Sequence, residues 1–179
     1  MKDPAAKKSL TNTRARIQAV AMVHKRLYTS GDVRVVALDE YLSALLEELQ
    51  ESLLRDGSGT SLRYALEQMQ LSTDATINLG VVVVEWVTNA VKYAYPDGTG
   101  EVRVKLQRVD ENKAELLVED DGRGLKTDAA ADGTGLGARI VKVVASGLKA
   151  DISYIAKTPG TVARLLFPLP PTMAVEATA

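Results

Sequence analysis

Three polar side chains stand at helical spacing in the middle of the sequence. Glu85, Asn89 and Lys92 occupy positions i, i+4 and i+7, so on a helix they share one narrow stripe. A carboxylate, an amide and an amine in one row have the chemistry to polarise a nucleophile, bind Mg²⁺ and contact a phosphate. By itself, such a row is more often the solvated face of an amphipathic helix.

Residues 120–124, Asp-Asp-Gly-Arg-Gly, follow an apolar segment that resembles a strand. Asp120 at the end of that strand can accept a hydrogen bond from an exocyclic amine, and Gly122 and Gly124 would let a ligand approach the backbone closely. An ordinary Asp-Gly turn explains this segment equally well when it is taken alone. The Gly-Thr pair that ends at Thr161 carries still less information on its own.

A second glycine-rich segment, residues 133–137, has the sequence Gly-Thr-Gly-Leu-Gly and opens a helical pattern. Unpaired N–H groups and the positive end of the helix dipole make such a start a natural phosphate site. No Gly-Lys-Ser/Thr follows, so the segment is not a P-loop, and its glycine spacing differs from the dinucleotide-binding fingerprint. Turn geometry alone does not explain three alternating glycines, which favours a functional role for Gly133, Gly135 and Gly137.

Periodicity and cap residues predict the elements that would position these segments. Residues 72–74 cap a long helix that reaches about Tyr93, and a shorter helix ends at Gly147. The short segment 69–71 would continue a hairpin from the first strand. Strands are predicted at 62–66, 101–109, 114–118, 152–155 and 162–167, with hairpins joining the second to the third and the fourth to the fifth. This order favours an α+β fold, a two-layer α/β sandwich with an antiparallel or mixed sheet.

The N-terminal part is predicted to be a short helical hairpin that precedes this sandwich. From Leu10 to Leu27, mostly apolar residues recur at spacings of three and four, a seam suited to packing against another helix. A second helix with a leucine-rich face is predicted from Asp39 to about Leu54. The predicted division is a helical segment at 1–57, a main domain at 58–168 and a tail at 169–179.

The composition excludes several classes of protein and site. The 22 basic and 23 acidic residues nearly balance, which argues against a dedicated nucleic-acid binder. Without cysteine the chain can form no disulfide, thiol nucleophile or Cys-ligated zinc site, and with one histidine, His24, it has no two-histidine metal site. The strongest apolar run, 79–84, is far shorter than the ~20 residues of a membrane helix. We expect a cytoplasmic chain that makes no membrane contact of its own.

In this order the four segments resemble the GHKL ATPase/kinase superfamily. Residues 85–93, Glu-Trp-Val-Thr-Asn-Ala-Val-Lys-Tyr, look like the N box of sensor histidine kinases, 120–124 like their G1 box and 133–137 like their G2 box. The resemblance covers about residues 62–168 and implies the GHKL (Bergerat) type of sandwich. It also implies in-line transfer of the γ-phosphoryl group of ATP, in which positioning and charge neutralisation supply most of the catalysis.

The resemblance implies a role for each matched residue. Asp120 would hold the adenine amine with help from Thr161, and Asn89 would ligate Mg²⁺ between the phosphates. Glu85 would act as base or polarising group toward the attacking imidazole, while Lys92 would neutralise phosphate charge. The implied ATP-binding residues are Asn89, Lys92, Tyr93, Asp120, Gly122, Gly124, Gly133, Thr134, Gly135, Leu136, Gly137 and Thr161.

Segments 16–28 and 38–46 are similar to the second half of the HisKA_2-type dimerisation and phosphotransfer region. In that family the phospho-accepting histidine lies upstream, in a His-Arg-x-x-Asn-type motif that this chain lacks. His24 falls on the apolar seam of the first helix, so we expect it to pack rather than to accept phosphate. The resemblance therefore implies a C-terminal part of a kinase whose acceptor lies outside this chain. Its expected partners are a second copy, bound through the N-terminal helices, and a response regulator receiver domain.

Two alternatives share parts of this pattern. A GHKL serine kinase of the anti-sigma type would carry the same boxes but would need no helical dimerisation segment. A non-catalytic adaptor would keep the fold without binding ATP. Such adaptors typically lose the glycine boxes, which this chain retains.

Overall fold

The computed structural model describes residues 35–55, 57–124 and 136–170, which fold into a layer of strands covered by a layer of helices. In chain order, the described elements are β1 (Val35–Ala37), α2 (Leu38–Arg55), β2 (Gly59–Leu66), β3 (Gln70–Ser72), α3 (Thr73–Tyr93), β4 (Thr99–Asp110), β5 (Lys113–Asp120), α4 (Leu136–Leu148), β6 (Asp151–Ala156) and β7 (Thr161–Pro168).

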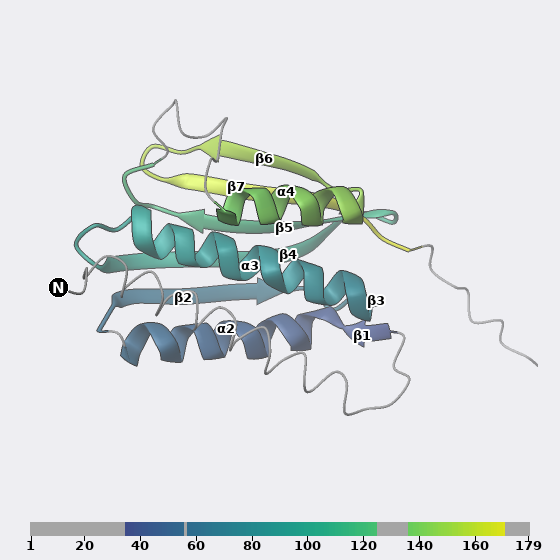
Figure 1. Ribbon diagram of the computed structural model, residues 1–179, viewed down its shortest axis with the longest axis horizontal. Helices are drawn as coiled ribbons and strands as arrows, with labels where there is room; N and C mark the ends of the chain where they lie inside the picture. Colours follow the sequence, from purple (N-terminus) through teal and green to yellow (C-terminus); the bar gives the residue numbers. More distant parts are fainter. Residues whose placement is uncertain (1–34, 56, 125–135, 171–179) are drawn as a thin grey trace, which may run out of the picture.

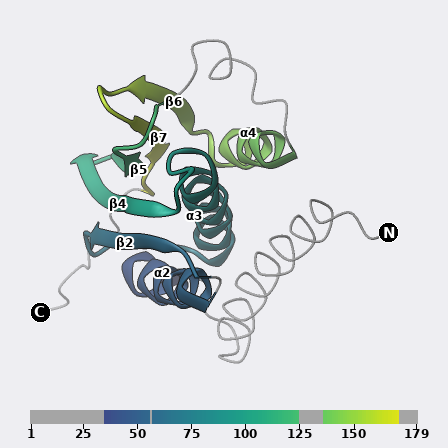
Figure 2. The ribbon, with the colours of Figure 1, turned by 90° about the vertical axis from the view of Figure 1, so that its left-hand side faces the viewer.

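The main sheet is mixed and has five strands in the order β2–β4–β5–β7–β6. β2 runs parallel to β4, whereas the other neighbouring strands are antiparallel. Figures 1 and 2 show that α3 and α4 cover one face of this sheet and that α2 lies beside β2. The predicted α+β sandwich with a mixed sheet is therefore confirmed.

Local sequence signals account for the central helix and for both hairpins. Ser72 is the N-cap of α3, and its Oγ accepts a hydrogen bond from the Ala75 N–H at 3.3 Å. The helix ends at Tyr93, shortly before Pro96, which disfavours further helix. β4 pairs with β5 and β6 pairs with β7, both antiparallel. The long helix and the two later hairpins are thus confirmed.

The apolar run 79–84 lies inside α3, and most of its side chains are buried in the core under the sheet. This burial explains the run without a lipid environment. None of the helices in the described part of the chain combines the length and hydropathy that a membrane span requires.

The predicted hairpin between 62–66 and 69–71 is wrong. β3 leaves the main sheet and pairs antiparallel with β1 in a separate two-stranded ribbon. Met69 and Leu71 are buried in the core, and the Met69 carbonyl accepts the Leu38 N–H at 2.9 Å. Packing at the starts of α2 and α3 therefore draws this segment away from the edge of β2.

Helix α2 shares the core of the main domain. The Tyr41 ring lies over Gly80 of α3, where a Cβ would collide with it. At the edge of β2, Gln50 accepts a hydrogen bond from the Leu62 N–H at 2.5 Å and donates one to the Thr60 carbonyl at 3.4 Å. These bonds cover a strand edge that would otherwise be open to pairing. The buried face of α2 consists of Leu38, Tyr41, Leu42, Leu45, Leu46 and Leu49.

The second predicted helix and its leucine-rich face are confirmed as α2. We expected this face to pair with a helix at 10–27, which lies outside the described residues. The face instead packs within the main domain, because β2 and α3 provide the apolar surface that it needs. Core contacts also continue past β7: Leu169 is buried and its N–H donates to the Asn112 carbonyl at 2.7 Å, inside the segment predicted as a tail.

Candidate active site

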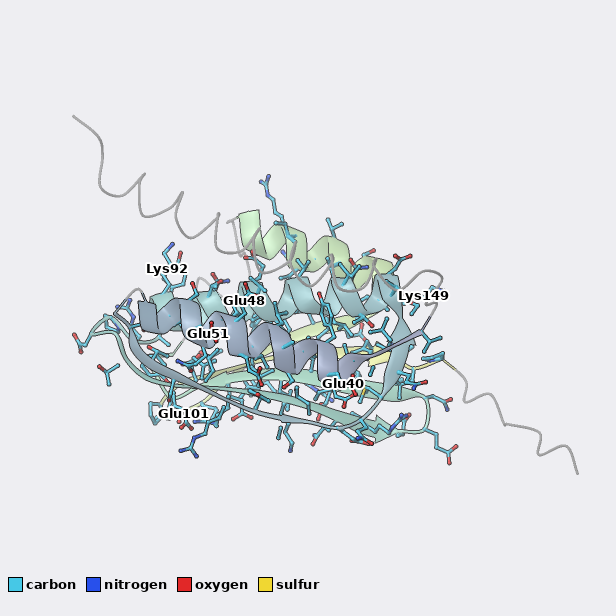
Figure 3. All side chains as sticks on the ribbon, turned by 90° about the horizontal axis from the view of Figure 1, so that it is seen from below. Glu40, Glu48, Glu51, Lys92, Glu101 and Lys149 are labelled. Carbon is cyan, nitrogen blue, oxygen red and sulfur yellow. The ribbon has the colours of Figure 1, made fainter. Side chains whose placement is uncertain are left out.

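The predicted polar stripe lies on α3 and runs from the interior to solvent. Glu85 is only 5% exposed, and its carboxylate lies against Gly137 in the first turn of α4, where a Cβ would collide with it. Asn89 is half-buried and Lys92 is exposed, with its Nζ 4.7 Å from the centre of the Tyr93 ring. A solvated helix face does not explain a buried carboxylate at a helix start. Figure 3 shows Lys92 on the helical side of the molecule, with Glu101 on the opposite side of the sheet.

Asp120, the last residue of β5, is a buried carboxylate at the same end of the sheet. It is 7% exposed, and its Oδ1 accepts a hydrogen bond from the Gly122 N–H at 2.9 Å. Burial raises the pKa of Asp120, and the hydrogen bond from Gly122 opposes that rise only in part. Thr161 of β7 stands directly opposite Asp120 in the sheet and is also buried. A buried acceptor beside a hydroxyl suits a ligand with an N–H donor.

The turn after Asp120 is attached to the C-terminal end of α3. Arg123 donates two hydrogen bonds there, from its N–H to the Ala94 carbonyl at 3.1 Å and from its Nε to the Tyr93 carbonyl at 2.7 Å. Gly122 packs so closely on Ala94 that a Cβ would collide with it. These bonds satisfy carbonyls that a helix end leaves open, and they bring Tyr93 and Asp120 to one end of the domain.

The position of residue 160 requires a glycine. Its φ is +107°, and a Cβ at this position would run into the Asp120 carbonyl. The turn between β6 and β7 therefore packs directly against the backbone of Asp120. Gly124, with φ of +74°, lies nearby against the Gly160 carbonyl. The Gly-Thr pair, uninformative as sequence, lies next to Asp120.

The structure thus brings two groups of predicted residues together: Glu85 with Gly137, and Tyr93 with Asp120, Gly122, Gly124 and Thr161. Asn89 and Lys92 lie on α3, the helix that carries Glu85 and Tyr93. Gly133, Thr134 and Gly135 lie outside the described residues, as does His24, while Leu136 and Gly137 begin α4. Across the described ranges, no group of three His, Cys, Asp or Glu side chains could hold a metal ion. The amide oxygen of Asn89 suits Mg²⁺ only if other ligands come from a bound molecule, as they do with nucleotide phosphates.

Sequence reasoning missed the residues that hold Asp121, the neighbour of Asp120. Arg103 of β4 makes a bidentate ion pair with the Asp121 carboxylate, and the Tyr95 hydroxyl accepts a hydrogen bond from the Asp121 N–H at 2.9 Å. The alternation of charges along β4 indicated an exposed strand face but not the partner of each charge. Only the register of β4 against β5 brings Arg103 to this turn.

Two protein families match the chain in successive, separate segments. Residues 74–171 match the HATPase_c family, described as histidine kinase-, DNA gyrase B-, and HSP90-like ATPase. Residues 1–53 match the HisKA_2 family, described as histidine kinase.

A curated relative, blue-light-activated histidine kinase 2 of Erythrobacter litoralis (strain HTCC2594), is 25% identical over 161 residues, which are 86% of this chain and 46% of the relative. The chain thus spans about half the length of that protein. Among solved structures, the histidine kinase domain of the Erythrobacter litoralis EL346 blue-light activated histidine kinase has a TM-score of 0.78 at 23% identity, covering 88% of this chain and 75% of that one. The mycobacterial sensor histidine kinase MprB has a TM-score of 0.60 at 24% identity, with coverages of 77% and 99%. A full-length ShkA structure in complex with AMPPNP has a TM-score of 0.62 at 19% identity, with coverages of 95% and 39%.

Proposed function

This chain belongs to the family of histidine kinase-, DNA gyrase B- and HSP90-like ATPases, and from that premise we propose that residues 58–168 bind ATP with Mg²⁺ and transfer its γ-phosphoryl group to a histidine. The observation that carries the proposal is the buried Asp120 carboxylate, which lies beside Thr161 and next to the end of the helix that bears Glu85, Asn89 and Lys92. The AMPPNP complex of ShkA, a protein of the same fold, supports a nucleotide as the ligand.

Asp120 would recognise the adenine. Its carboxylate interacts with the backbone of Gly122 and of Thr161, and each carboxylate oxygen can accept more than one bond, so the group can also accept the exocyclic amine of the base. The Thr161 hydroxyl would add a second polar contact from the neighbouring strand. A base without an amine at this point would leave a buried carboxylate with one bond fewer, which disfavours its binding.

The helix α3 and the start of α4 would hold the phosphates. Gly137 lies in the first turn of α4, and by the resemblance the amides of Gly135 and Gly137 would bind the phosphates at this helix N-terminus. Lys92 would add a positive charge, and Tyr93 would flank the nucleotide. Asn89 would ligate Mg²⁺, which when bound neutralises charge on the phosphate oxygens. Glu85 would orient or deprotonate the attacking imidazole, and its buried carboxylate beside Gly137 supports this role.

The remaining assignments concern the larger assembly. We place the acceptor histidine outside this chain, because His24 lies on the apolar seam predicted for residues 10–27. The apolar face of α2 is buried in the main domain, so a homodimer would rest on that predicted helix. A response regulator receiver domain would take the phosphoryl group from the acceptor, in the cytoplasm.

Calorimetry with ATP tests the nucleotide assignment. Asp120→Asn keeps an oxygen for the Gly122 N–H but turns an N–H₂ toward the adenine amine, so affinity should fall at least about tenfold. The control is Asp151→Asn, an exposed aspartate at the start of β6. Equal binding by wild type and Asp120→Asn would refute the adenine role. No binding by wild type would favour the non-catalytic adaptor.

A second experiment separates Mg²⁺ binding from phosphoryl transfer. Asn89→Ala should bind ATP without Mg²⁺ as wild type does and lose the added affinity that Mg²⁺ confers. With γ-³²P-labelled ATP, an added acceptor-helix segment should carry acid-labile label that disappears in Asn89→Ala. Label on this chain alone that vanishes in His24→Ala would make His24 the acceptor, and acid-stable label would indicate a serine kinase instead.

A further inference from the structure

The Asp121 carboxylate is bound by two cations, one on β4 and one just after β6. Arg103 of β4 binds it in a bidentate manner, with Nη1 2.6 Å from Oδ2 and Nη2 2.8 Å from Oδ1. Lys157, just after β6, approaches Oδ1 at 3.2 Å. A bidentate Arg–carboxylate pair fixes the orientation of the carboxylate as well as its distance, which a single surface ion pair does not.

The Asp121 backbone is held by a tyrosine. The Tyr95 hydroxyl accepts the Asp121 N–H at 2.9 Å and donates to the Glu101 carbonyl at 2.5 Å. Its ring lies over Gly100, where a Cβ would collide with it. Tyr95 therefore ties the turn after β5 to the start of β4 through a hydroxyl whose donor and acceptor are both in use.

We propose that Arg103 and Tyr95 are positioning residues that hold the adenine-binding carboxylate of Asp120 through its neighbour Asp121. This inference rests on the proposed function and deepens it. Asp120 is oriented by the Gly122 N–H, and Asp121 is the residue between them in the chain. With Asp121 released, the Gly122 N–H can leave Asp120 and the buried carboxylate loses its fixed direction.

Arg103 acts through Asp121 and not on the ligand. Residues alternate between the faces of a strand, so Arg103 shares the face of Glu101, which Figure 3 shows on the side of the sheet away from Lys92. Arg103 also approaches Glu101 and Glu119 at 3.4 and 3.6 Å, so it is the central cation of this acidic surface. No other described arginine contacts Asp121.

Arg63 provides the matched control. It pairs with the same Glu101 at 2.8 Å on the same face but makes no contact with Asp121. The test compares Arg103→Gln, Arg103→Lys, Tyr95→Phe and Arg63→Gln, each measured for ADP affinity, for hydrogen exchange of the 120–124 amides without nucleotide, and for thermal unfolding.

Arg103→Gln and Tyr95→Phe should each weaken ADP binding about tenfold and speed amide exchange at Gly122. Arg103→Lys should recover only part of the affinity, because a lysine cannot make the bidentate pair. Arg63→Gln should match wild type in affinity and exchange. In an Asp121→Asn background, Arg103→Gln should have little further effect, as expected if Arg103 acts through Asp121.

The inference is overturned if Arg103→Gln and Tyr95→Phe bind ADP as wild type does, or if Arg63→Gln weakens binding as much as they do. A lowered melting temperature with unchanged affinity and exchange would make the pair a stabilising contact only. Failure of the proposed function is distinct, because wild type itself would then not bind ADP, and the inference would fall with it.

Discussion

The Glu85 carboxylate of α3 lies against Gly137 of α4 with no room for a side chain between them. An acidic group at the first turn of a helix faces the positive end of its dipole, a favourable arrangement in a buried site. The contact also joins the first residue of the N-box pattern to the last glycine of the second glycine-rich segment. It therefore connects two motifs that are distant in sequence and whose proposed roles concern the same phosphate group.

Gly137→Ala should impair phosphoryl transfer more than stability. The new methyl group would displace the end of the Glu85 side chain, while the better helix propensity of alanine would offset up to about 1 kcal/mol of any strain. We expect unfolding free energy within about 1 kcal/mol of wild type and at least about tenfold slower transfer from labelled ATP. Gly147→Ala is the matched control on the same helix, since a Cβ there meets nothing within 4 Å. Identical transfer rates for the two variants would argue against the role of this contact.

Gly160→Ala should strongly destabilise the domain. The position combines φ of +107° with a Cβ that would overlap the Asp120 carbonyl, a backbone atom that cannot rotate away. Together these effects should cost about 3 kcal/mol or more. Gly98→Ala, at φ of +76° with open space around the Cβ, should cost only about 1–2 kcal/mol. Urea denaturation followed by the fluorescence of the single tryptophan, Trp86, measures both. Comparable losses would show that the close approach to Asp120 adds nothing.

Stability at low pH should depend on Asp121. Its hydrogen bond with Arg103, supported by Lys157, lowers its pKa from 3.8 to about 2. A carboxylate with a lowered folded-state pKa stabilises the fold above its unfolded pKa, and this contribution is lost as pH falls through the folded value. The difference in melting temperature between wild type and Asp121→Asn should thus be constant above about pH 5 and shrink between about pH 4 and pH 2. Other carboxylates are common to both proteins and largely cancel. A difference that stays constant through this range would contradict the pairing.

Leu45→Ala should destabilise α2 and the main sheet as one cooperative unit. Leu45 is fully buried in a core cluster that also contains residues of α3 and β4, so its truncation should cost about 2–5 kcal/mol. Trp86 is buried on α3 and reports on the main domain. Its fluorescence transition in urea should move to lower concentration and coincide with the loss of helical circular dichroism. A Trp86 transition unchanged by the substitution would mean that α2 unfolds as a separate unit.

Much of the fold follows from local signals in the sequence. The Ser72 cap of α3, the alternation of apolar and charged residues in β4 and the apolar run of β5 depend on residues close in the chain, and the structure confirms these three elements. The parallel pairing of β2 with β4 and the pairing of β1 with β3 depend on packing between distant segments, which no local pattern encodes. The β1–β3 pairing is the reason why the predicted hairpin between 62–66 and 69–71 is wrong.

The site divides in the same way. Glu85 and Asp120 could be proposed from the sequence because each belongs to a recognisable motif, and the structure adds that both side chains are buried. The role of Gly160 could not be predicted from the sequence, because it depends on the Asp120 carbonyl, which approaches from another strand. Arg103 and Tyr95 were missed for the same reason: an arginine on a polar strand and a tyrosine in a turn are ordinary until their contacts with Asp121 are known.

The strand pairings have a consequence for the order in which the chain folds. Hairpins β4–β5 and β6–β7 close short loops, but β1–β3 encloses α2, β2–β4 encloses α3, and β5–β7 encloses α4. Each described helix thus lies inside one loop that a non-local strand pair must close. A formed helix shortens the flexible length of its loop and so lowers the entropy lost on closure. Helices and hairpins should therefore form first, and the three enclosing pairs, with their high contact order, should set the rate of refolding.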